Sequence, residues 1–381
     1  MKKAYGAVII GGGILGNATA YYMAKLGFKD VLVVEKNYIA SGSTGRCAGG
    51  IRQQWDSEYN IKLAMGSVKI FERLEDELGF PTEYYQGGYL LLAYEESHAE
   101  WFRQRVQLQR SLGLDVRLLD PYEAKQIVPF INTDGLLAAT FCPTDGHANP
   151  FLVTFGYYKA AQRLGVDYAV QTEVVDIEVK EDRITGVRLN TGDFVETEVV
   201  VNVAGGWAKE VAKMVGIDIP VNPQRHEIAV TEPLEMFFDP LIISFKHGIY
   251  FRQELSGGVI MGYGDPNEPW SHNIKSSFKF LRNVTAKVAA VMPLMDDVRI
   301  LRQWAGSYAM TPDAQPIIGG VEQVEGYYQA VGFSGHGFMV GPKTAQLLAE
   351  LIVLGQPSMS LEPLSLNRFK KGEIKREKAV I

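Results

Sequence analysis

The sequence is poor in cysteine, carries no excess of positive charge and has no long apolar run. Its two cysteines, Cys47 and Cys142, exclude a disulfide framework and favour a reduced, cytoplasmic setting. Lys and Arg number 38 against 44 Asp and Glu, a net charge of −6 that argues against a nucleic-acid-binding protein. The longest apolar runs, such as residues 347–354, are too short to cross a bilayer, so no membrane span is expected.

What the sequence does contain is the composition of a folded globule. Of its 381 residues, 46% are hydrophobic and 22% are charged, which indicates a substantial core and excludes disorder over most of the length. This length fits one large α/β domain or two interleaved ones. The 39 glycines show no collagen period, so we expect them to serve turns and close backbone approach to a ligand.

The first twenty residues imitate a secretory signal, with two early lysines, an apolar stretch and small residues at 18–20. Four glycines between positions 11 and 16 interrupt that stretch, and glycine fits a helical signal core poorly. We therefore favour a buried strand at 4–10, a helix at 14–26 and a second strand at 31–35, which together form a βαβ unit.

The rest of the chain alternates between helical and strand patterns, without an internal repeat or a flexible linker. Asn149 followed by Pro150 is a good helix start, with Asn as the N-cap. Helices are expected at 57–78, 97–112, 150–164, 274–291 and 338–354, strands within 170–203, 224–265, 298–308 and 326–331, and a hairpin at 84–94.

The early glycines form the pattern Gly11-x-Gly13-x-x-Gly16 between the first strand and the first helix. Gly11 makes the tight turn, Gly13 lets a pyrophosphate approach the backbone, and Gly16 permits close helix–strand contact. The helix N-terminus then faces the phosphates with the positive end of its dipole. Glu35 follows the second strand and is expected to bind the adenosine ribose hydroxyls, which disfavours the 2′-phosphate of NADP.

Three later segments favour FAD over NAD as the dinucleotide. Residues 41–46 form a loop of small hydroxyl residues and one Arg, suited to surround the second phosphate. Residues 201–207 run from a strand into small residues and end at Trp207. Residues 332–337 precede the last helix, where their N–H groups are placed to hold negative charge on a reduced flavin.

Together these features resemble the FAD-dependent amine oxidoreductases of the D-amino-acid oxidase, glycine oxidase and sarcosine oxidase family. The resemblance covers nearly the whole chain and is greatest to the β subunits of sarcosine-oxidase-type and dye-linked L-proline dehydrogenase complexes. It rests on four stretches: Ser41-Gly-Ser-Thr-Gly-Arg-Cys-Ala-Gly-Gly-Ile-Arg-Gln-Gln54, Pro143-Thr-Asp-Gly-His-Ala-Asn-Pro-Phe151, Trp304-Ala-Gly-Ser-Tyr-Ala-Met-Thr-Pro-Asp313 and Gly332-Phe-Ser-Gly-His-Gly-Phe-Met339.

The expected fold is α/β, with a Rossmann-like FAD-binding domain interleaved with a substrate domain built on a mixed or antiparallel β-sheet. Nucleotide-binding elements at the start, middle and end of the chain predict domains that share it alternately. The FAD-binding domain is expected at 1–80, 145–220 and 305–365, and the substrate domain at 81–144 and 221–304. A basic C-terminal tail, 366–381, follows; a solvated terminus and a contact with another subunit both stay open for it.

The cofactor site is predicted from the glycine motif and the resemblance together. No metal site is expected. The residues expected to bind FAD are Gly11, Gly13, Ile14, Leu15, Gly16, Glu35, Lys36, Ser43, Thr44, Arg46, Gly49, Gly50, Ile51, Val174, Ala204, Gly205, Trp207, Gly306, Gly335, His336, Gly337, Phe338 and Met339.

The chain departs from the family's oxidases at several functional positions. Gly306 stands where monomeric sarcosine oxidases carry the flavin-linking Cys, which implies non-covalent FAD. Ile260 stands near the place of a Lys that promotes reaction with oxygen, and Met339 at that of a substrate-binding Lys. Tyr308 replaces the carboxylate-binding Arg of glycine oxidases. The His that anchors FMN in heterotetrameric sarcosine oxidases has no counterpart near Asn149, so an FMN at a subunit interface stays open.

A carboxylate substrate still needs a cation. The resemblance points to Arg52, and Arg252 is a second candidate on a strand expected to face the flavin; each could instead form an ordinary ion pair. His336, in the glycine loop, could orient substrate or flavin, and so could His226, for which a structural role is equally open. Cys47 is expected to serve packing, and the apolar substrate wall is expected from Tyr250, Phe251, Tyr308 and Met339.

These departures favour an FAD-dependent dehydrogenase over an oxidase. The expected substrate is a small secondary amino acid such as L-proline, hydroxyproline or sarcosine, which gives hydride to flavin N5. Electrons would pass to partner subunits that carry electron-transfer cofactors, in a cytoplasmic enzyme or one attached to a membrane through its complex. Two alternatives stay open: a self-sufficient glycine or D-amino-acid oxidase that forms hydrogen peroxide, and a flavoprotein subunit that only relays electrons or supports a complex.

Overall fold

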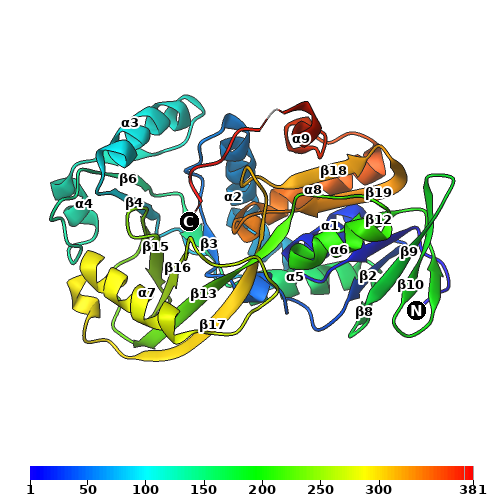
Figure 1. The fold of residues 1–381 in the computed structure, drawn as a ribbon, viewed down its shortest axis with the longest axis horizontal. Helices are drawn as coiled ribbons and strands as arrows, with labels where there is room; N and C mark the ends of the chain where they lie inside the picture. Colours follow the sequence, from blue (N-terminus) through cyan, green and yellow to red (C-terminus); the bar gives the residue numbers. More distant parts are fainter. Residues whose placement is uncertain (373, 381) are drawn as a thin grey trace.

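Two large β-sheets form the two halves of the molecule, and helix α2 stands between them (Figure 1). The computed structural model describes residues 1–372 and 374–380. The predicted α/β fold, a Rossmann-like part interleaved with a mixed sheet, is confirmed, because strands of both sheets alternate along the chain. The exact domain boundaries given above stay a prediction.

The first sheet is built around five parallel strands. Strand β1 (Ala7–Ile10) pairs in parallel with β2 (Val31–Glu35) on one side and with β12 (Val200–Asn202) on the other. Strand β8 (Asp167–Val170) extends the sheet beyond β2, and β19 (Val324–Val331) extends it beyond β12. Strands β1, β2 and β12 are buried at every position, because both faces of the sheet are covered.

Alternate side chains of the central strands enter different cores. Ala7 and Ile9 pack with the helices of one face, whereas Val8 and Ile10 pack with the opposite layer. The first layer consists of α1 (Ile14–Lys25), α2 (Glu58–Leu78), α5 (Pro150–Arg163) and α8 (Gly337–Leu354). The opposite layer consists of β9 (Val174–Lys180), β10 (Arg183–Leu189), β11 (Phe194–Glu196) and α6 (Ala208–Met214), and β18 (Ile317–Val321) pairs with β19 at its side.

The second sheet is mixed, because β14 (Leu241–Ser244) pairs in parallel with β4 (Tyr89–Ala93) and every other neighbour is antiparallel. One face packs on α7 (Phe278–Val291) and α4 (Pro121–Ile127), and part of the other packs on α3 (Glu96–Ser111). The strands, in spatial order, are β17 (Ile300–Met310), β13 (Asn222–Pro233), β16 (Gly258–Tyr263), β15 (Ile249–Gln253), β14 (Leu241–Ser244), β4 (Tyr89–Ala93), β6 (Ala138–Cys142) and β5 (Arg117–Leu119).

Short elements connect the two halves. A ribbon of β3 (Gly50–Ile51) and β7 (Gly146–His147) lies where the sheets meet. Single helical turns occur at Thr44–Arg46, Gly205–Trp207, Pro293–Met295 and Glu362–Leu364, and a last short helix, α9, spans Arg368–Lys371.

The N-cap predicted at Asn149 is confirmed, and α2 also begins with a side-chain cap. The Ser57 side chain accepts a hydrogen bond from the Asn60 amide and caps α2, and Asn149 caps α5 with Pro150 as its first residue. The hairpin expected at 84–94 is wrong, because only β4 forms there and its partners come from β6 and β14. Gly88 has a φ of +85°, and a Cβ there would lie 2.5 Å from the Phe141 ring, so this glycine lets strands pack rather than turns the chain back.

The region expected to be a basic tail is in part buried. Arg368 is 3% exposed, and its Nε and one terminal nitrogen donate to the two carboxylate oxygens of Asp313, at 2.8 and 3.1 Å. A fully solvated terminus is therefore excluded for this part of 366–381, although Glu373 and Ile381 lie outside the described residues.

Helix α8 is the one helix in the described residues whose length and apolar composition would suffice to cross a membrane. It packs against α1 and α2, and half of its residues are buried inside the protein, which is also how a core helix of a globular fold behaves.

We expect Arg368→Ala to destabilise the protein by about 3–5 kcal/mol, because Asp313 would be left as an unpaired buried charge. Urea unfolding followed by circular dichroism measures the change. The matched control is Lys371→Ala, whose exposed ion pair with Glu362 should contribute little. Equal stability of the two variants would contradict a folded, buried Arg368.

Candidate active site

The turn between β1 and α1 is shaped for close approach to a ligand. Gly11 has a φ of +123°, and a Cβ there would meet the Val203 carbonyl oxygen at 2.6 Å. A Cβ on Gly16 would overlap the Gly11 carbonyl, so α1 can lie against the strand only with glycine at this position. Gly13 is the N-cap of α1 and has no side chain to cap it, while the Ile14 amide donates to the Thr44 hydroxyl at 3.2 Å. The first amide groups of α1 therefore point their positive dipole end into the groove.

Glu35 closes one side of this groove. Its two carboxylate oxygens accept hydrogen bonds from the Gly12 and Asn37 amides, each at 2.8 Å, and the Ser41 hydroxyl lies at 3.3 Å. The amides fix the carboxylate at the carboxyl end of β2, where its remaining lone pairs can accept from a ribose hydroxyl. The groove is lined by the predicted residues Gly11, Gly13, Glu35, Lys36, Ser43, Thr44, Arg46, Val174, Ala204, Gly205 and Trp207.

Two basic side chains of the groove lack a carboxylate partner among the described residues. The Lys36 ammonium lies 3.4 Å from the centre of the Trp207 ring. Arg46 donates to two main-chain carbonyls, those of Ser41 and Ala305, at 3.1 and 3.0 Å. These contacts position the side chains without neutralising them, so both leave positive charge for an anionic ligand.

A second cavity continues from this groove and shares Gly13, Ser43 and Arg46 with it. Its walls come from the start of α1, from β17 and from the loop before α8. His226, for which a functional and a structural role were both open, lines this cavity. Its ring stacks on that of Tyr308, with the ring centroids 3.6 Å apart and an interplanar angle of 10°. The predicted residues in this cavity are Ile14, Leu15, Gly306, Tyr308, Gly335, Gly337 and Phe338.

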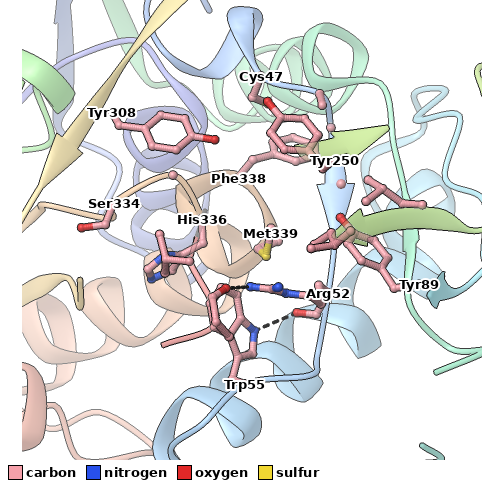
Figure 2. A pocket seen from close by; sticks show the side chains of 18 residues that line it. Cys47, Arg52, Trp55, Tyr89, Tyr250, Tyr308, Ser334, His336, Phe338 and Met339 are labelled. Carbon is pink, nitrogen blue, oxygen red and sulfur yellow. Dashed lines mark hydrogen bonds between the residues drawn. The ribbon is translucent and has the colours of Figure 1, made fainter. Parts of the chain in front are cut away.

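A third cavity opens from the second where Cys47, Tyr308 and Phe338 line both (Figure 2). It contains five of the residues expected at the substrate site: Arg52, Tyr250, Tyr308, His336 and Met339. Gly49 and Gly50 line this cavity rather than the dinucleotide groove, whereas Ile51 is fully buried in the core. The wall also includes Trp55, Tyr89, Leu241, Ile243, Ser334, Ala379 and Val380, which sequence reasoning missed.

Arg52 is the cation of this cavity. It is 4% exposed, and its guanidinium carbon lies 4.1 Å from the centre of the Trp55 ring. One terminal nitrogen donates to the Ala379 main-chain carbonyl, and Nε has no partner among the described residues. Burial lowers the pKa of Arg52, so a bound carboxylate would relieve the desolvation of its charge.

The backbone that carries Arg52 is held from behind by Asp145. This buried carboxylate accepts from the Gln53 amide at 2.8 Å and from the Gln54 side chain at 3.0 Å. Gln54 in turn accepts from the Thr140 hydroxyl. Burial raises the pKa of Asp145 to about 6, and these donors favour its charged form. The network fixes the turn from which Arg52 projects into the cavity.

Of three further candidate residues, Tyr250 lines the cavity, whereas Arg252 and Phe251 do not. Arg252 does not line the cavity; its Nε donates to the Ala48 carbonyl and a terminal nitrogen to Glu254, each at 2.7 Å, so it ties the 47–50 loop to β15. Phe251 points to the α7 side of the sheet because side chains alternate along a strand, and so it is no wall of the cavity. Tyr250 faces the cavity and lies over Gly262, where a Cβ would be 2.4 Å from its hydroxyl.

His336 lies at the edge of the cavity with no hydrogen-bond partner for either ring nitrogen within the described residues. It is 4% exposed and its ring centre is 4.8 Å from that of Trp55. Burial and then the Arg52 charge lower the pKa of His336 to about 3, so the ring is neutral at pH 7 and offers one donor and one acceptor. Burial also raises the pKa of Tyr308 to about 12, so its hydroxyl stays protonated.

Comparison with known proteins agrees with this geometry. The profile of the DAO family, described as FAD dependent oxidoreductase, matches residues 7–351. The chain belongs to this family. Sarcosine oxidase subunit beta from Rhizobium meliloti is 30% identical over 99% of this chain and 91% of its own length. Mitochondrial dimethylglycine dehydrogenase from Rattus norvegicus is 29% identical over 96% of this chain, which spans only 45% of that protein.

Among solved structures, L-proline dehydrogenase from P. horikoshii is 37% identical, with a TM-score of 0.94 over 98% of this chain and all of the other. Glycine oxidase from Geobacillus kaustophilus shares the fold with a TM-score of 0.88 at 24% identity, over 96% of this chain and 99% of its own. The predicted resemblance and the FAD-dependent oxidoreductase activity are thereby confirmed.

FAD is the cofactor of this family, and the cavities fit it. The glycine-bounded groove with its helix N-terminus suits the dinucleotide, and the second cavity suits the ring system. Gly306 lines that second cavity, and a Cβ there would lie 3.0 Å from the Arg46 side chain. Non-covalent attachment stays a prediction, as do the roles of the individual lining residues.

We expect Glu35→Gln to weaken FAD binding by about 1.5–3 kcal/mol, because an amide replaces the charged acceptor that Gly12 and Asn37 hold in place. Titration of apoprotein with FAD, followed by quenching of flavin fluorescence, gives the dissociation constant. Glu325→Gln, at an exposed ion pair away from the groove, is the control. Unchanged affinity in the Glu35 variant would mean that this carboxylate only ends a strand.

Proposed function

We propose that the protein is a dehydrogenase that oxidises the C–N bond of a small secondary amino acid, such as L-proline, hydroxyproline or sarcosine. The observation that carries the proposal is the buried Arg52 guanidinium in the third cavity, here called the substrate cavity, whose lining is largely apolar. This cavity opens onto the second one, the ring cavity of the FAD site. Relatives named sarcosine oxidase subunit beta and L-proline dehydrogenase support this substrate class.

The cavity binds and orients its substrate with few charged groups. Arg52 offers the substrate carboxylate a bidentate partner, and Trp55 under the guanidinium keeps its plane fixed. Tyr250, Tyr308 and Met339 provide the wall for the carbon skeleton. When bound, FAD supplies the acceptor for the hydride that leaves the substrate carbon.

The lack of acidic side chains in the described lining affects the protonation state of the substrate amine. No Asp or Glu lines the substrate cavity in the part of the chain that the structure describes. A protonated amine would therefore lack a counter-ion there, so the cavity favours the neutral nitrogen from which a hydride can leave the adjacent carbon. Neutral His336, whose ring nitrogens have no partner among the described residues, can orient that nitrogen by a hydrogen bond.

The route of the electrons after the reaction is the second part of the proposal. No Lys lines the substrate or ring cavity in the described residues, and Ile260 packs with Ala48 and Ile228, which line these cavities. A lysine ammonium beside the ring would stabilise the negative charge that develops when oxygen is reduced. The cations that do line these cavities, Arg46 and Arg52, are instead assigned to the cofactor and to the substrate carboxylate, so direct reaction with oxygen is disfavoured. We propose transfer to a partner subunit instead, supported by the relatives that are β subunits.

We expect Arg52→Ala to raise the dissociation constant for L-proline or sarcosine by about 30-fold or more, because the substrate carboxylate would be buried without its partner. Arg52→Lys should restore part of the affinity, since it keeps the charge but loses the bidentate geometry. Anaerobic titration of the flavin absorbance gives the constant, and unchanged flavin content shows that the FAD site is intact. An unaltered constant in Arg52→Ala with normal flavin content would disprove the assignment.

We expect the reduced isolated chain to react slowly with oxygen. The measurement is to reduce the protein with substrate under nitrogen, admit air and follow the return of the flavin absorbance. Reoxidation should be much slower than with an artificial dye, and Ile260→Lys should accelerate it because it adds a cation behind the ring cavity. Reoxidation by air as fast as turnover would instead favour a self-sufficient oxidase that forms hydrogen peroxide.

A further inference from the structure

The last described residues of the chain lie between the two sheets, at the substrate cavity (Figure 1). We name residues 374–380 the strap. Glu377 and Ala379 are buried, whereas Lys378 between them is exposed. Ala379 and Val380 line the cavity that contains Arg52, so the strap forms one wall of the substrate site.

The strap is held mainly by hydrogen bonds around Glu377. The Glu377 carboxylate accepts from the Asp56 amide at 3.1 Å and from the Asn60 side chain at 2.8 Å. The Lys378 amide donates to the Asp56 carboxylate at 2.8 Å, and the Glu377 amide donates to the Asp313 carbonyl. We refer to these contacts as the latch. Trp101 and Arg105 from α3 bind the other carboxylate oxygen of Asp56.

The latch consists of hydrogen bonds between polar groups, and it holds the carboxylates of Glu377 and Asp56 close together. Burial and then the charge of Asp56 raise the pKa of Glu377, because two carboxylates lie close together in a buried place. The strap brings little apolar area to offset this, since Val380 is only half-buried and Ile374 is 47% exposed. A segment fixed by a few hydrogen bonds opens more readily than a packed core element.

The strap also accepts a hydrogen bond from Arg52, the group that the proposed substrate needs. Arg52 donates to the Ala379 carbonyl, drawn as a dashed line in Figure 2. A neutral carbonyl is a weaker acceptor for a guanidinium than a carboxylate is, so a substrate carboxylate can displace it. One terminal nitrogen of Arg52 is thus paired with the protein's own main chain.

We propose that the strap is a gate whose Ala379 carbonyl competes with the substrate carboxylate for Arg52, so that binding of the substrate releases the strap from the cavity. This inference rests on the proposed function, because it takes Arg52 as the carboxylate-binding group. The gate makes the apparent affinity depend on the fraction of molecules with an open strap.

Opening of the strap can be measured by its cleavage with trypsin, because Lys375, Arg376 and Lys378 are exposed trypsin sites. The experiment uses the full FAD-loaded chain and pyrrole-2-carboxylate, a flat ring carboxylate with no hydride to donate at the carbon that bears the carboxylate. Saturation with this probe should speed cleavage in the strap about threefold or more, while cleavage at Lys370 and Lys371 in α9 stays constant. Pyrrole-2-carboxamide, which lacks the charge, should have no effect. Unchanged or slower strap cleavage with the carboxylate would overturn the gate.

Variants that weaken the latch test the competition by their effect on the affinity for the probe. Glu377→Ala removes the latch carboxylate and should bind pyrrole-2-carboxylate about three- to tenfold more tightly, because more molecules have an open strap. Lys378→Ala changes an exposed neighbouring side chain, keeps the main-chain bond to Asp56, and should bind as the parent does. A chain that ends after Arg376 serves as a second latch-free variant if Glu377→Ala folds poorly. Parental or weaker affinity in the latch-free variants would show that the strap only builds the site.

Arg52→Ala separates failure of the gate from failure of the proposed function. Faster strap cleavage together with weaker probe binding supports both. Weaker binding with unchanged strap cleavage overturns the gate and leaves the proposed function intact. Unchanged probe binding overturns the proposed function, and with it the competition for Arg52.

Discussion

The account depends on one buried positive charge, the Arg52 guanidinium at the junction of the two sheets. It lies over the Trp55 ring and is screened from solvent, so its charge is available mainly to what enters the cavity. The neighbouring structure serves to fix it there. Asp145 holds the turn that carries Arg52 from the side of the second sheet, and the packing of α2 and α8 closes the other side.

The three cavities are connected because the chain crosses repeatedly between the halves. The loop from 41 to 52 passes from the dinucleotide groove along the ring cavity to the substrate cavity, and each of the three includes residues from it. Arg46 and Arg252 tie this loop to β17 and β15 through main-chain carbonyls. These two arginines therefore fix the loop, which lines all three cavities, relative to the second sheet.

The sequence was informative where a local pattern carries a physical requirement. The glycines at 11, 13 and 16 and the cap at Asn149 each predict a local geometry, and the structure has it. Arg52 was accessible through the resemblance alone. Period-two alternation in β15 would have removed Phe251 from the substrate wall, because it places Phe251 opposite Tyr250.

What the sequence could not reveal depends on contacts between distant segments. Arg252 shares a sheet face with Tyr250, and only the position of the 47–50 loop above it decides that it supports rather than lines the cavity. The Gly87-Gly88 pair looks like a turn but allows the close approach of β4 and Phe141. Ala379 and Val380 carry no chemical signature, so their place in the cavity appears only when residues more than 300 positions apart are brought together.

The most direct test of the central claim is anaerobic reduction of the bound flavin by matched pairs of amines with and without a carboxylate. L-Proline is compared with pyrrolidine, sarcosine with dimethylamine, and both acids with the primary amino acids glycine and D-alanine. The account predicts that the flavin is bleached rapidly by a secondary amino acid and not by the amine that lacks its carboxylate. Equal bleaching by pyrrolidine and L-proline, or bleaching by the primary amino acids alone, would contradict it.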